Sequence, residues 1–144
     1  MNVINSFTKE YRFLSNFYIT PVTYEGITYP SSENAYQAAK SRDADTRIKM
    51  ATLSPAQSKK LGQTVTLIPE WELNKVNIME TILKSKFENI QLARWLKDTD
   101  DAILIEGNLW HDNFWGACNC PTCADKKKLN TLGQLLMKVR SELT

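Results

Sequence analysis

The chain has little of what marks several large classes of protein. Its 144 residues include one histidine and three cysteines, and 18 basic side chains against 16 acidic ones leave a net charge of only +2. This balance argues against a dedicated nucleic-acid binder, whose basic side chains gather on one face. No apolar run approaches the roughly 20 residues needed to cross a bilayer, and no basic segment followed by an apolar run opens the chain. We therefore expect a cytoplasmic protein with no membrane partner.

Nothing in the composition divides the chain. It contains no internal repeat, no low-complexity tract and no linker-like shift, and 42% of its residues are hydrophobic. A chain of this size can bury one core. We predict a single domain over residues 1–144, of the α+β class, mostly helical and with a small β-hairpin or sheet near the N-terminus.

Local patterns place the strands early and the helices after them. Glu25-Gly26 separates two short extended runs, which predicts a hairpin over residues 22–29, and residues 3–7 are also expected to be extended. Helices are predicted from residue 33, over 55–62, from Pro69 to about 87, over 90–96, and near the C-terminus from 132. The apolar run 102–105 is interpreted as a buried strand that leads into Glu106-Gly107-Asn108.

The helix predicted from residue 33 carries four polar side chains of different chemistry at i, i+3, i+4 and i+7, which places them on one face. They are Glu33, Tyr36, Gln37 and Lys40. Ser31 or Ser32 can cap this helix, and an acidic first turn suits its dipole. Free backbone N–H groups at such a start could hold phosphate. An ordinary solvated helix with a capping glutamate is the alternative.

A second unusual stretch, residues 106–116, suits neither a helix face nor a strand face. It combines two carboxylates, two amide side chains, two tryptophans and the only histidine, with glycines at both ends. Glycine lets a ligand approach the backbone closely, tryptophan offers a flat surface for stacking, and Asp112 offers a carboxylate for proton transfer. The mixture indicates a site for a sugar, a base or both. A structural loop with core-filling tryptophans is the alternative.

Motifs along nearly the whole chain, from about residue 6 to residue 140, follow one family pattern. They are Phe13-Leu14-Ser15-Asn16-Phe17, Tyr29-Pro30-Ser31-Ser32-Glu33 with Tyr36-Gln37 and Lys40, Gly107-Asn108 with Trp110, Asp112 with Trp115-Gly116, and Asn130 with Gly133 and Leu135-Leu136-Met137. In these motifs the chain resembles the YbiA-like family, also called NADAR. The resemblance implies the YbiA-like fold and an enzyme that breaks N-glycosidic bonds.

The family offers two kinds of substrate. Some members cleave the base-to-ribose bond of early riboflavin-pathway intermediates, and others remove ADP-ribose from guanine. We predict first an N-glycosidase acting on ADP-ribosylated guanine, in a nucleotide or in DNA, and as an alternative one acting on phosphoribosylamino-pyrimidine intermediates of riboflavin biosynthesis. A module that binds ADP-ribose or NAD-like ligands without cleaving them is a further alternative. The expected partner is a phosphorylated ribosyl or ADP-ribosyl small molecule, and the sequence does not specify the oligomeric state.

Two carboxylates and an amine are the predicted catalytic groups. Cleavage builds oxocarbenium-like charge on the ribose and negative charge on the base, so one carboxylate can stabilise the sugar while a proton donor serves the base. Glu33 and Asp112 are the predicted pair. Lys40 can act as a Schiff-base nucleophile or as a phosphate anchor. The family motif implies substrate contacts at Asn16, Phe17, Tyr36, Gln37, Asn108, Trp110, Trp115, Gly116 and Asn130, with the tryptophans against the base or ribose and Asn108 on ribose hydroxyls.

All three cysteines lie within one short segment, Cys118-Asn119-Cys120-Pro121-Thr122-Cys123, and His111 precedes it. Together, His111, Cys118, Cys120 and Cys123 could complete a tetrahedral zinc site. Against a metal, Cys118 and Cys120 are only two apart and no second CxxC is present. We predict a free-thiol connector and no cofactor. Structural zinc and a zinc-ribbon-like nucleic-acid adaptor stay open, and a cytoplasmic setting disfavours a disulfide.

Overall fold

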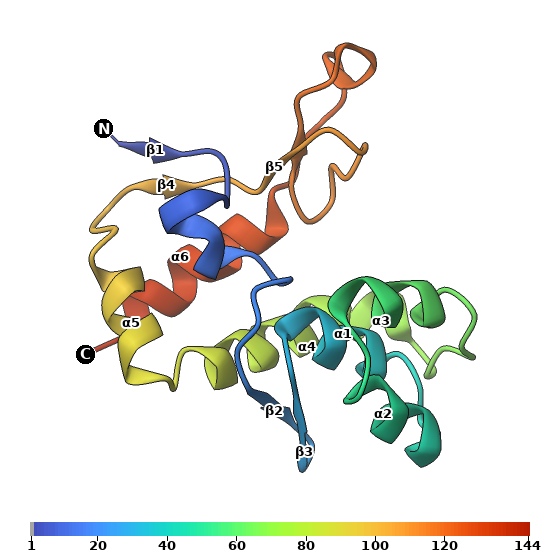
Figure 1. Ribbon diagram of the computed structural model, residues 1–144. Coiled ribbons are helices and arrows are strands. Elements are labelled where there is room, and N and C mark those ends of the chain that lie inside the picture. Colours follow the sequence, from blue (N-terminus) through green and yellow to red (C-terminus); the bar gives the residue numbers. More distant parts are fainter. Residues whose placement is uncertain (1) are drawn as a thin grey trace. The chain divides into compact units, whose positions relative to one another are not determined.

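The computed structural model describes residues 2–144, and their contacts form two compact units (Figure 1). The central unit holds residues 16–89, and the terminal unit holds the described residues up to Ser15 together with Ile90–Thr144. Both contain helices and short paired strands, which confirms the α+β prediction. In the part of the chain described, none of the helices has the length and apolar character needed to span a bilayer.

Helix α1, Ser32–Ala39, is the core of the central unit. It packs against α2 (Ala44–Met50), α3 (Pro55–Gly62), α4 (Trp71–Lys86) and the antiparallel hairpin of β2 (Val22–Tyr24) and β3 (Ile27–Tyr29). Neighbours on several sides bury every residue of α1, its polar ones included. A buried polar side chain must find a hydrogen-bond partner or lose free energy, so the polar face of α1 cannot be an ordinary solvated surface.

Three local predictions for the central unit are confirmed. Glu25 and Gly26 connect β2 to β3 with φ values of 47° and 86°, the left-handed pair that a two-residue hairpin turn requires. The Ser31 hydroxyl caps α1 by accepting a hydrogen bond from the Asn34 N–H at 3.1 Å. Helix α3 starts with a capping box between Ser54 and Gln57 and ends at Gly62.

Other boundaries of the central unit differ from the prediction. Helix α4 begins at Trp71 and not at Pro69, because Glu70 adopts a left-handed conformation with φ 57°. Helix α2 was not predicted, since its seven residues carry too little apolar periodicity to detect. Its start signal is nevertheless present, because the Asp43 carboxylate accepts a hydrogen bond from the Thr46 N–H at 2.9 Å.

The terminal unit contains two pairs of parallel strands. Strand β1 (Val3–Ile4) pairs with β4 (Ile103–Leu104), as Figure 1 shows, and β5 (Gly107–Asn108) pairs with β6 (Ala117–Cys118). Of these four strands, only β1 and β4 were expected as extended segments. The unit also contains the 3₁₀ turns η1 (Lys9–Leu14) and η2 (Pro121–Cys123) and the helices α5 (Ile90–Lys97) and α6 (Thr131–Glu142).

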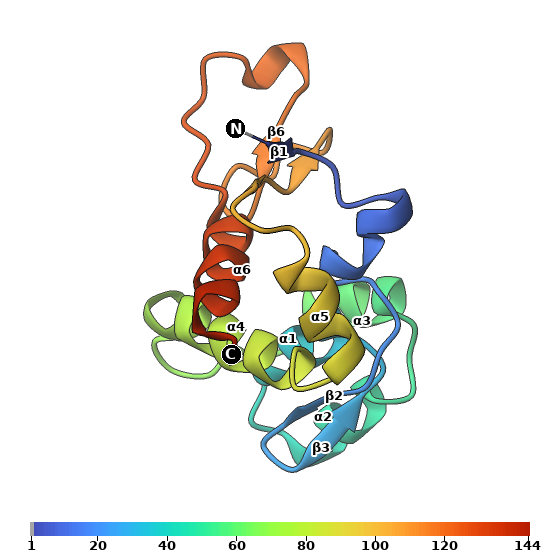
Figure 2. The same cartoon turned by 90° about the vertical axis from the view of Figure 1, so that its left-hand side faces the viewer.

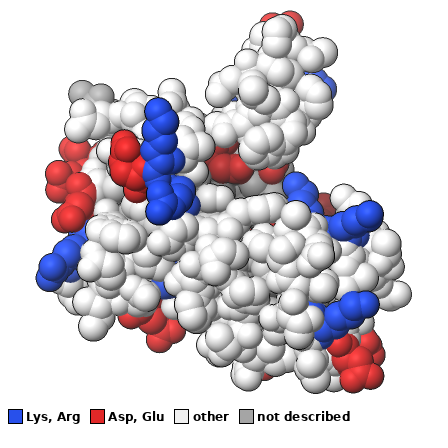
Figure 3. Space-filling model, viewed as in Figure 1, with Lys and Arg blue, Asp and Glu red and all other residues white. Residues whose placement is uncertain are grey.

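Helix α6 lies against β4 and α5. The buried face of α6 is formed by Leu132, Leu135, Leu136 and Val139, as the spacing of these residues predicted. A Cβ on Gly133 would come within 2.1 Å of the Leu104 carbonyl oxygen, so glycine allows the close contact between α6 and β4. The segment around η2 projects from the rest of this unit (Figure 2), and on the face drawn in Figure 3 this projection is mostly uncharged.

Candidate functional site

The polar residues of α1 form a buried cluster around Glu33. Gln37 Nε2 donates a hydrogen bond of 2.6 Å to Glu33 Oε2, and the Glu33 N–H donates to the Asn16 carbonyl oxygen at 2.9 Å. Glu33 is 8% exposed and Gln37 3% exposed. A Cβ on Gly62 would lie 1.9 Å from Gln37 Oε1, so a glycine in α3 leaves the room that the Gln37 amide occupies. The carboxylate of Glu33 is therefore held in one orientation.

Several oxygen atoms of this cluster have no hydrogen-bond partner. Asn16 Oδ1, Ser32 Oγ and Gln37 Oε1 are buried and unpaired among residues 2–144. An unsatisfied buried polar atom costs about 1–3 kcal/mol, and native proteins usually supply a partner through water or a ligand. These atoms can accept hydrogen bonds from hydroxyl groups, which a sugar has in number.

Amines and aromatic rings lie beside α1. Lys40 Nζ lies 5.5 Å from the centroid of the Tyr36 ring, and Lys59 Nζ lies 5.9 Å from that of Phe17. Burial lowers the pKa of Lys40, Glu33 acts in the opposite direction, and the nearby cations of Lys75 and Lys59 lower it further. The surroundings of Lys40 thus contain both cations and carboxylates, the latter from Glu33 and Glu72.

The start of α1 is not available to phosphate in the way expected. The Glu33 N–H is occupied by the Asn16 carbonyl, and the Asn34 N–H by the Ser31 hydroxyl. The prediction of free N–H groups is therefore wrong for these two positions, because the chain itself caps them. An anion is better served by the side chains of Lys40 and Lys59.

Lys86 is a candidate that the sequence analysis missed. It is fully buried in α4, with Nζ 5.9 Å from the Tyr18 ring centroid and 5.4 Å from that of Phe87. Burial lowers its pKa to about 7. Lys86 lies four residues after Ile82 and three after Leu83, both buried. A lysine at an apolar position of the helical repeat was thus the available signal.

The second predicted stretch forms a loop that its own side chains hold in shape. Asn108 Nδ2 donates to the Asp112 carbonyl at 2.8 Å, and Asn108 Oδ1 accepts from the N–H groups of Trp110 and Asp112 at 3.1 and 3.2 Å. Asp112 Oδ1 accepts from the N–H groups of Phe114 and Trp115 at 3.1 and 2.9 Å. Both residues therefore have a structural role in the loop.

Asn130 and Gly116 fix the base of the same loop. Asn130, with φ 49°, accepts a hydrogen bond from the Glu106 N–H at 3.0 Å and donates one to the Leu104 carbonyl at 2.9 Å. A Cβ on Gly116 would lie 2.2 Å from the Glu106 carbonyl oxygen. The close approach of the neighbouring backbone thus explains why a glycine occupies position 116. Contact of Asn130 and Gly116 with substrate stays a prediction.

The aromatic residues of the loop differ in exposure. Trp110 is 61% exposed, whereas Trp115 is partly buried and meets the Phe114 ring edge-on at 4.9 Å. Trp110 thus presents a flat surface that a base could cover. Glu33 belongs to the central unit and Asp112 to the terminal unit, so their joint action also stays a prediction.

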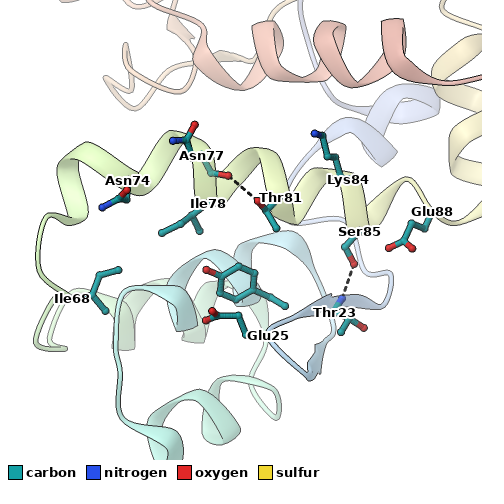
Figure 4. A pocket seen from close by; sticks show the side chains of 11 residues that line it. Thr23, Glu25, Ile68, Asn74, Asn77, Ile78, Thr81, Lys84, Ser85 and Glu88 are labelled. Atoms are coloured by element: carbon teal, nitrogen blue, oxygen red, sulfur yellow. Dashed lines mark hydrogen bonds between the residues drawn. The ribbon is translucent and has the colours of Figure 1, made fainter.

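Two pockets are lined by other residues. One, of about 640 Å³, is in the central unit, where Thr23 and Glu25 face Asn74, Asn77 and Thr81 of α4 (Figure 4). The other, of about 540 Å³, is in the terminal unit beside η1 and residues 98–102. Neither is lined by a predicted catalytic or binding residue, so cavity volume alone does not locate the polar cluster of α1.

Comparison with known protein families identifies the family of this chain. The model of the NADAR domain matches residues 4–144. The chain belongs to the NADAR family. This confirms the resemblance inferred from the motifs.

Known relatives agree with the family assignment. The chain is 32% identical over 142 residues to the N-glycosidase YbiA of Escherichia coli strain K12, covering 96% of this chain and 85% of that protein. The NMR structure of the E. coli protein YbiA matches with a TM-score of 0.81 at 31% identity, over 99% of this chain and 88% of the other. These matches confirm the YbiA-like fold, and the names of NADAR relatives support N-glycosidase activity.

A further relative is the chloroplastic riboflavin biosynthesis protein PYRR of Zea mays. It is 33% identical over 132 residues, which are 81% of this chain. The chain spans only 20% of the length of the maize protein. The similarity therefore concerns one part of that protein.

Proposed function

We propose that the protein is an N-glycosidase that hydrolyses the bond between a base and a phosphorylated ribose, with Glu33 as its main acid–base residue. The observation that supports this most is the buried polar cluster of α1. It combines an oriented carboxylate with unpaired oxygen atoms, next to lysines. A solvated helix needs none of these features, whereas a sugar phosphate has chemistry that complements each of them.

Glu33 would act on the water that replaces the base. The bond from C1 of ribose to the base nitrogen breaks, its electron pair leaves with the base, and C1 gains positive charge. The ionised Glu33 stabilises that charge and accepts a proton as water adds to C1. The proton then passes to the departing base, which balances the reaction. Gln37, by donating to Glu33 Oε2, would help to orient the carboxylate for this step.

The groups around Glu33 would bind the rest of the substrate. Asn16 Oδ1 and Gln37 Oε1 would accept hydrogen bonds from ribose hydroxyls, since each is buried and unpaired. Lys40 and Lys59 would hold phosphate, because among residues 2–144 neither forms an ion pair with a carboxylate. Phe17, which is 42% exposed, offers a ring face beside Lys59.

Two substrates follow from this chemistry. Phosphoribosylamino-pyrimidine intermediates of riboflavin biosynthesis are favoured by the name of the maize relative. ADP-ribosylated guanine, the first prediction from the sequence, has the same ribosyl bond and more phosphate for the lysines to bind. Asp112, Trp110 and Trp115 keep their predicted roles as second carboxylate and stacking surfaces. Each requires its own substitution as a test.

A substrate panel tests the proposal. Purified protein is incubated separately with phosphoribosylamino-pyrimidines and with ADP-ribosylated guanine, as mononucleotide and in DNA, and the products are identified by mass spectrometry. Release of a free pyrimidine with ribose phosphate, or of ADP-ribose with unmodified guanine nucleotide or DNA, supports the proposal and names the substrate. Tight binding without release would favour a binding module, and neither binding nor release in any sample would overturn the proposal. Glu10→Gln, at an exposed position of η1, is the matched control for Glu33→Gln.

A further inference from the structure

His111 and the three cysteines converge on one point of the terminal unit. One ligand atom from each of His111, Cys118, Cys120 and Cys123 lies within 4.8 Å of every other. His111 Nδ1 is 3.3 Å from the sulfurs of Cys120 and Cys123 and 3.9 Å from that of Cys118. The cysteines form no disulfide. Four soft ligand atoms therefore surround one small space.

The three N···S distances are close to the edges of a zinc tetrahedron. With Zn–S of about 2.3 Å and Zn–N of about 2.0–2.1 Å, tetrahedral angles separate a nitrogen from a sulfur by roughly 3.5 Å and two sulfurs by roughly 3.8 Å. The three measured N···S distances lie on both sides of the first value. The side chains need little movement to bind the metal.

The surrounding backbone supports thiolates at this place. The N–H groups of His111 and Cys120 both point at Cys118 Sγ, at 3.4 and 3.5 Å. The Asn113 side chain accepts from the Cys118 N–H at 2.9 Å, which fixes that residue in turn. Outer contacts of this kind orient metal ligands. Lys128 Nζ donates to the Cys123 carbonyl at 3.0 Å, and its cation lies near the net negative charge that three thiolates and Zn²⁺ would carry.

We propose that His111, Cys118, Cys120 and Cys123 bind one zinc ion as a closed structural site. Four protein ligands complete the coordination and leave no position for a reactive water. The ion would brace residues 111–123, which connect β5 to η2 and include Asp112 and Trp115. Its role is therefore to stabilise the loop. The proposal is independent of the glycosidase activity, because it depends only on these four residues.

This assignment replaces the free-thiol connector favoured by the sequence alone. The spacing argued against zinc because Cys118 and Cys120 are separated by one residue. The parallel pairing of β5 with β6 and the turn η2 remove that objection, since they bring the sulfurs of Cys118 and Cys123 within 3.9 and 3.3 Å of His111 Nδ1 without a second CxxC. Both of these cysteines are buried.

Metal analysis of the untagged full chain tests the proposal. The protein is produced in zinc-supplemented medium and its metal content is measured by plasma mass spectrometry, with one zinc per chain as the expected result. Cys118→Ser and Cys123→Ser should lose the zinc. Asn119→Ser, an exposed position in the same segment, should retain it. Wild-type protein without stoichiometric zinc, or full zinc in both cysteine variants, would overturn the proposal.

Two measurements on the wild-type chain do not depend on the folding of variants. Zinc should protect all three cysteines from alkylation until a strong chelator is added, and cobalt(II) added to the metal-free chain should give the visible absorption of a tetrahedral thiolate complex. Chelation should also lower Tm, because a ligand that binds only the folded state stabilises it. Thiols that react equally with and without chelator, together with no cobalt absorption, would contradict the site.

Discussion

The two polar regions of this protein use similar side chains in opposite ways. In α1, Glu33 and Gln37 hydrogen-bond to each other, while nearby oxygen atoms are buried and have no partner among the described residues 2–144. In the loop of residues 108–116, Asn108 and Asp112 direct their oxygen atoms at backbone N–H groups of the same loop. The first region has hydrogen-bonding capacity left for a ligand, whereas much of the capacity of the second is used to hold its own shape.

This contrast distinguishes two roles that a residue of the family motif can have. A residue in the motif can be required because it touches the substrate or because it shapes the backbone that does. Residue type alone cannot distinguish them, since asparagine and aspartate serve both purposes equally well. Substitutions that change charge without changing shape can distinguish the two roles. The following predictions are ordered by the size of the expected effect.

Glu33→Gln should cause the largest loss. The amide is nearly isosteric but cannot accept a proton or stabilise positive charge, so turnover should fall by roughly 10²-fold or more. Substrate affinity should change little, because the hydroxyl and phosphate contacts remain. Turnover and KM measured beside the Glu10→Gln control give the answer. Unchanged turnover would remove Glu33 from the chemistry.

Asp112 can be tested with two different substitutions. Asp112→Asn keeps an Oδ1 acceptor for the N–H groups of Phe114 and Trp115 but removes the charge, whereas Asp112→Ala removes both. If Asp112 is the second carboxylate, Asp112→Asn should lower turnover by up to about 10²-fold with Tm nearly unchanged. Asp112→Ala should in addition cost about 1–2 kcal/mol of stability, the usual scale for losing a cap. Near-normal turnover in Asp112→Asn would leave only the structural role.

The two lysines with lowered pKa, Lys40 and Lys86, can be compared in one trapping experiment. If an amine attacks C1 of the ring-opened sugar, borohydride added during turnover should trap an adduct that peptide mapping assigns to one of them. The arginine variant of that lysine should then be inactive. If Lys40 only anchors phosphate, Lys40→Arg should retain activity with KM raised roughly several-fold, because guanidinium also binds phosphate. No adduct at either lysine would favour direct attack by water.

Lys86→Met should change stability in a pH-dependent way. The pKa of Lys86 is about 7 in the folded chain against an ordinary 10.5, so between these pH values the unfolded chain binds more protons and folding becomes more favourable as pH rises. Methionine removes the cost of burying the charge. The variant should therefore exceed wild type in Tm by about a few degrees near pH 6, and this gain should shrink toward pH 10.

Thermal melts across this pH range check the prediction for Lys86. Lys84→Met, at an exposed position of the same helix, is the control and should show no such trend. A Tm difference between Lys86→Met and wild type that does not change with pH would mean that burial does not govern the protonation of Lys86.

The sequence predicted those parts of the fold that have local signals. The hairpin at Glu25-Gly26, the serine caps of α1 and α3 and the apolar face of α6 depend on residues close together in the chain. The short pair β5 and β6 could not be predicted, because two-residue strands carry no periodicity and their pairing depends on contacts ten residues apart. For the same reason the convergence of His111 with the cysteines was visible only as an open alternative.

Prediction of the candidate site from sequence was limited in the same way. The helical spacing correctly placed Glu33 beside Gln37 and Tyr36 beside Lys40. It could not show that α1 is buried on all sides, since that depends on α2, α3, α4 and the hairpin. Lys86 was missed because a lysine on a helix is usually solvated, and only tertiary packing makes this one buried.

The most direct test of the account is to map where a sugar phosphate binds. Ribose 5-phosphate and ADP-ribose are added to isotopically labelled Glu33→Gln protein, and amide chemical-shift changes are followed by NMR. The account predicts that, within the central unit, the changes centre on α1 and on Asn16, Phe17 and Lys59, with little change at Asn74, Asn77 and Thr81 in the pocket of Figure 4. Changes confined to that pocket, or none with either ligand, would contradict it.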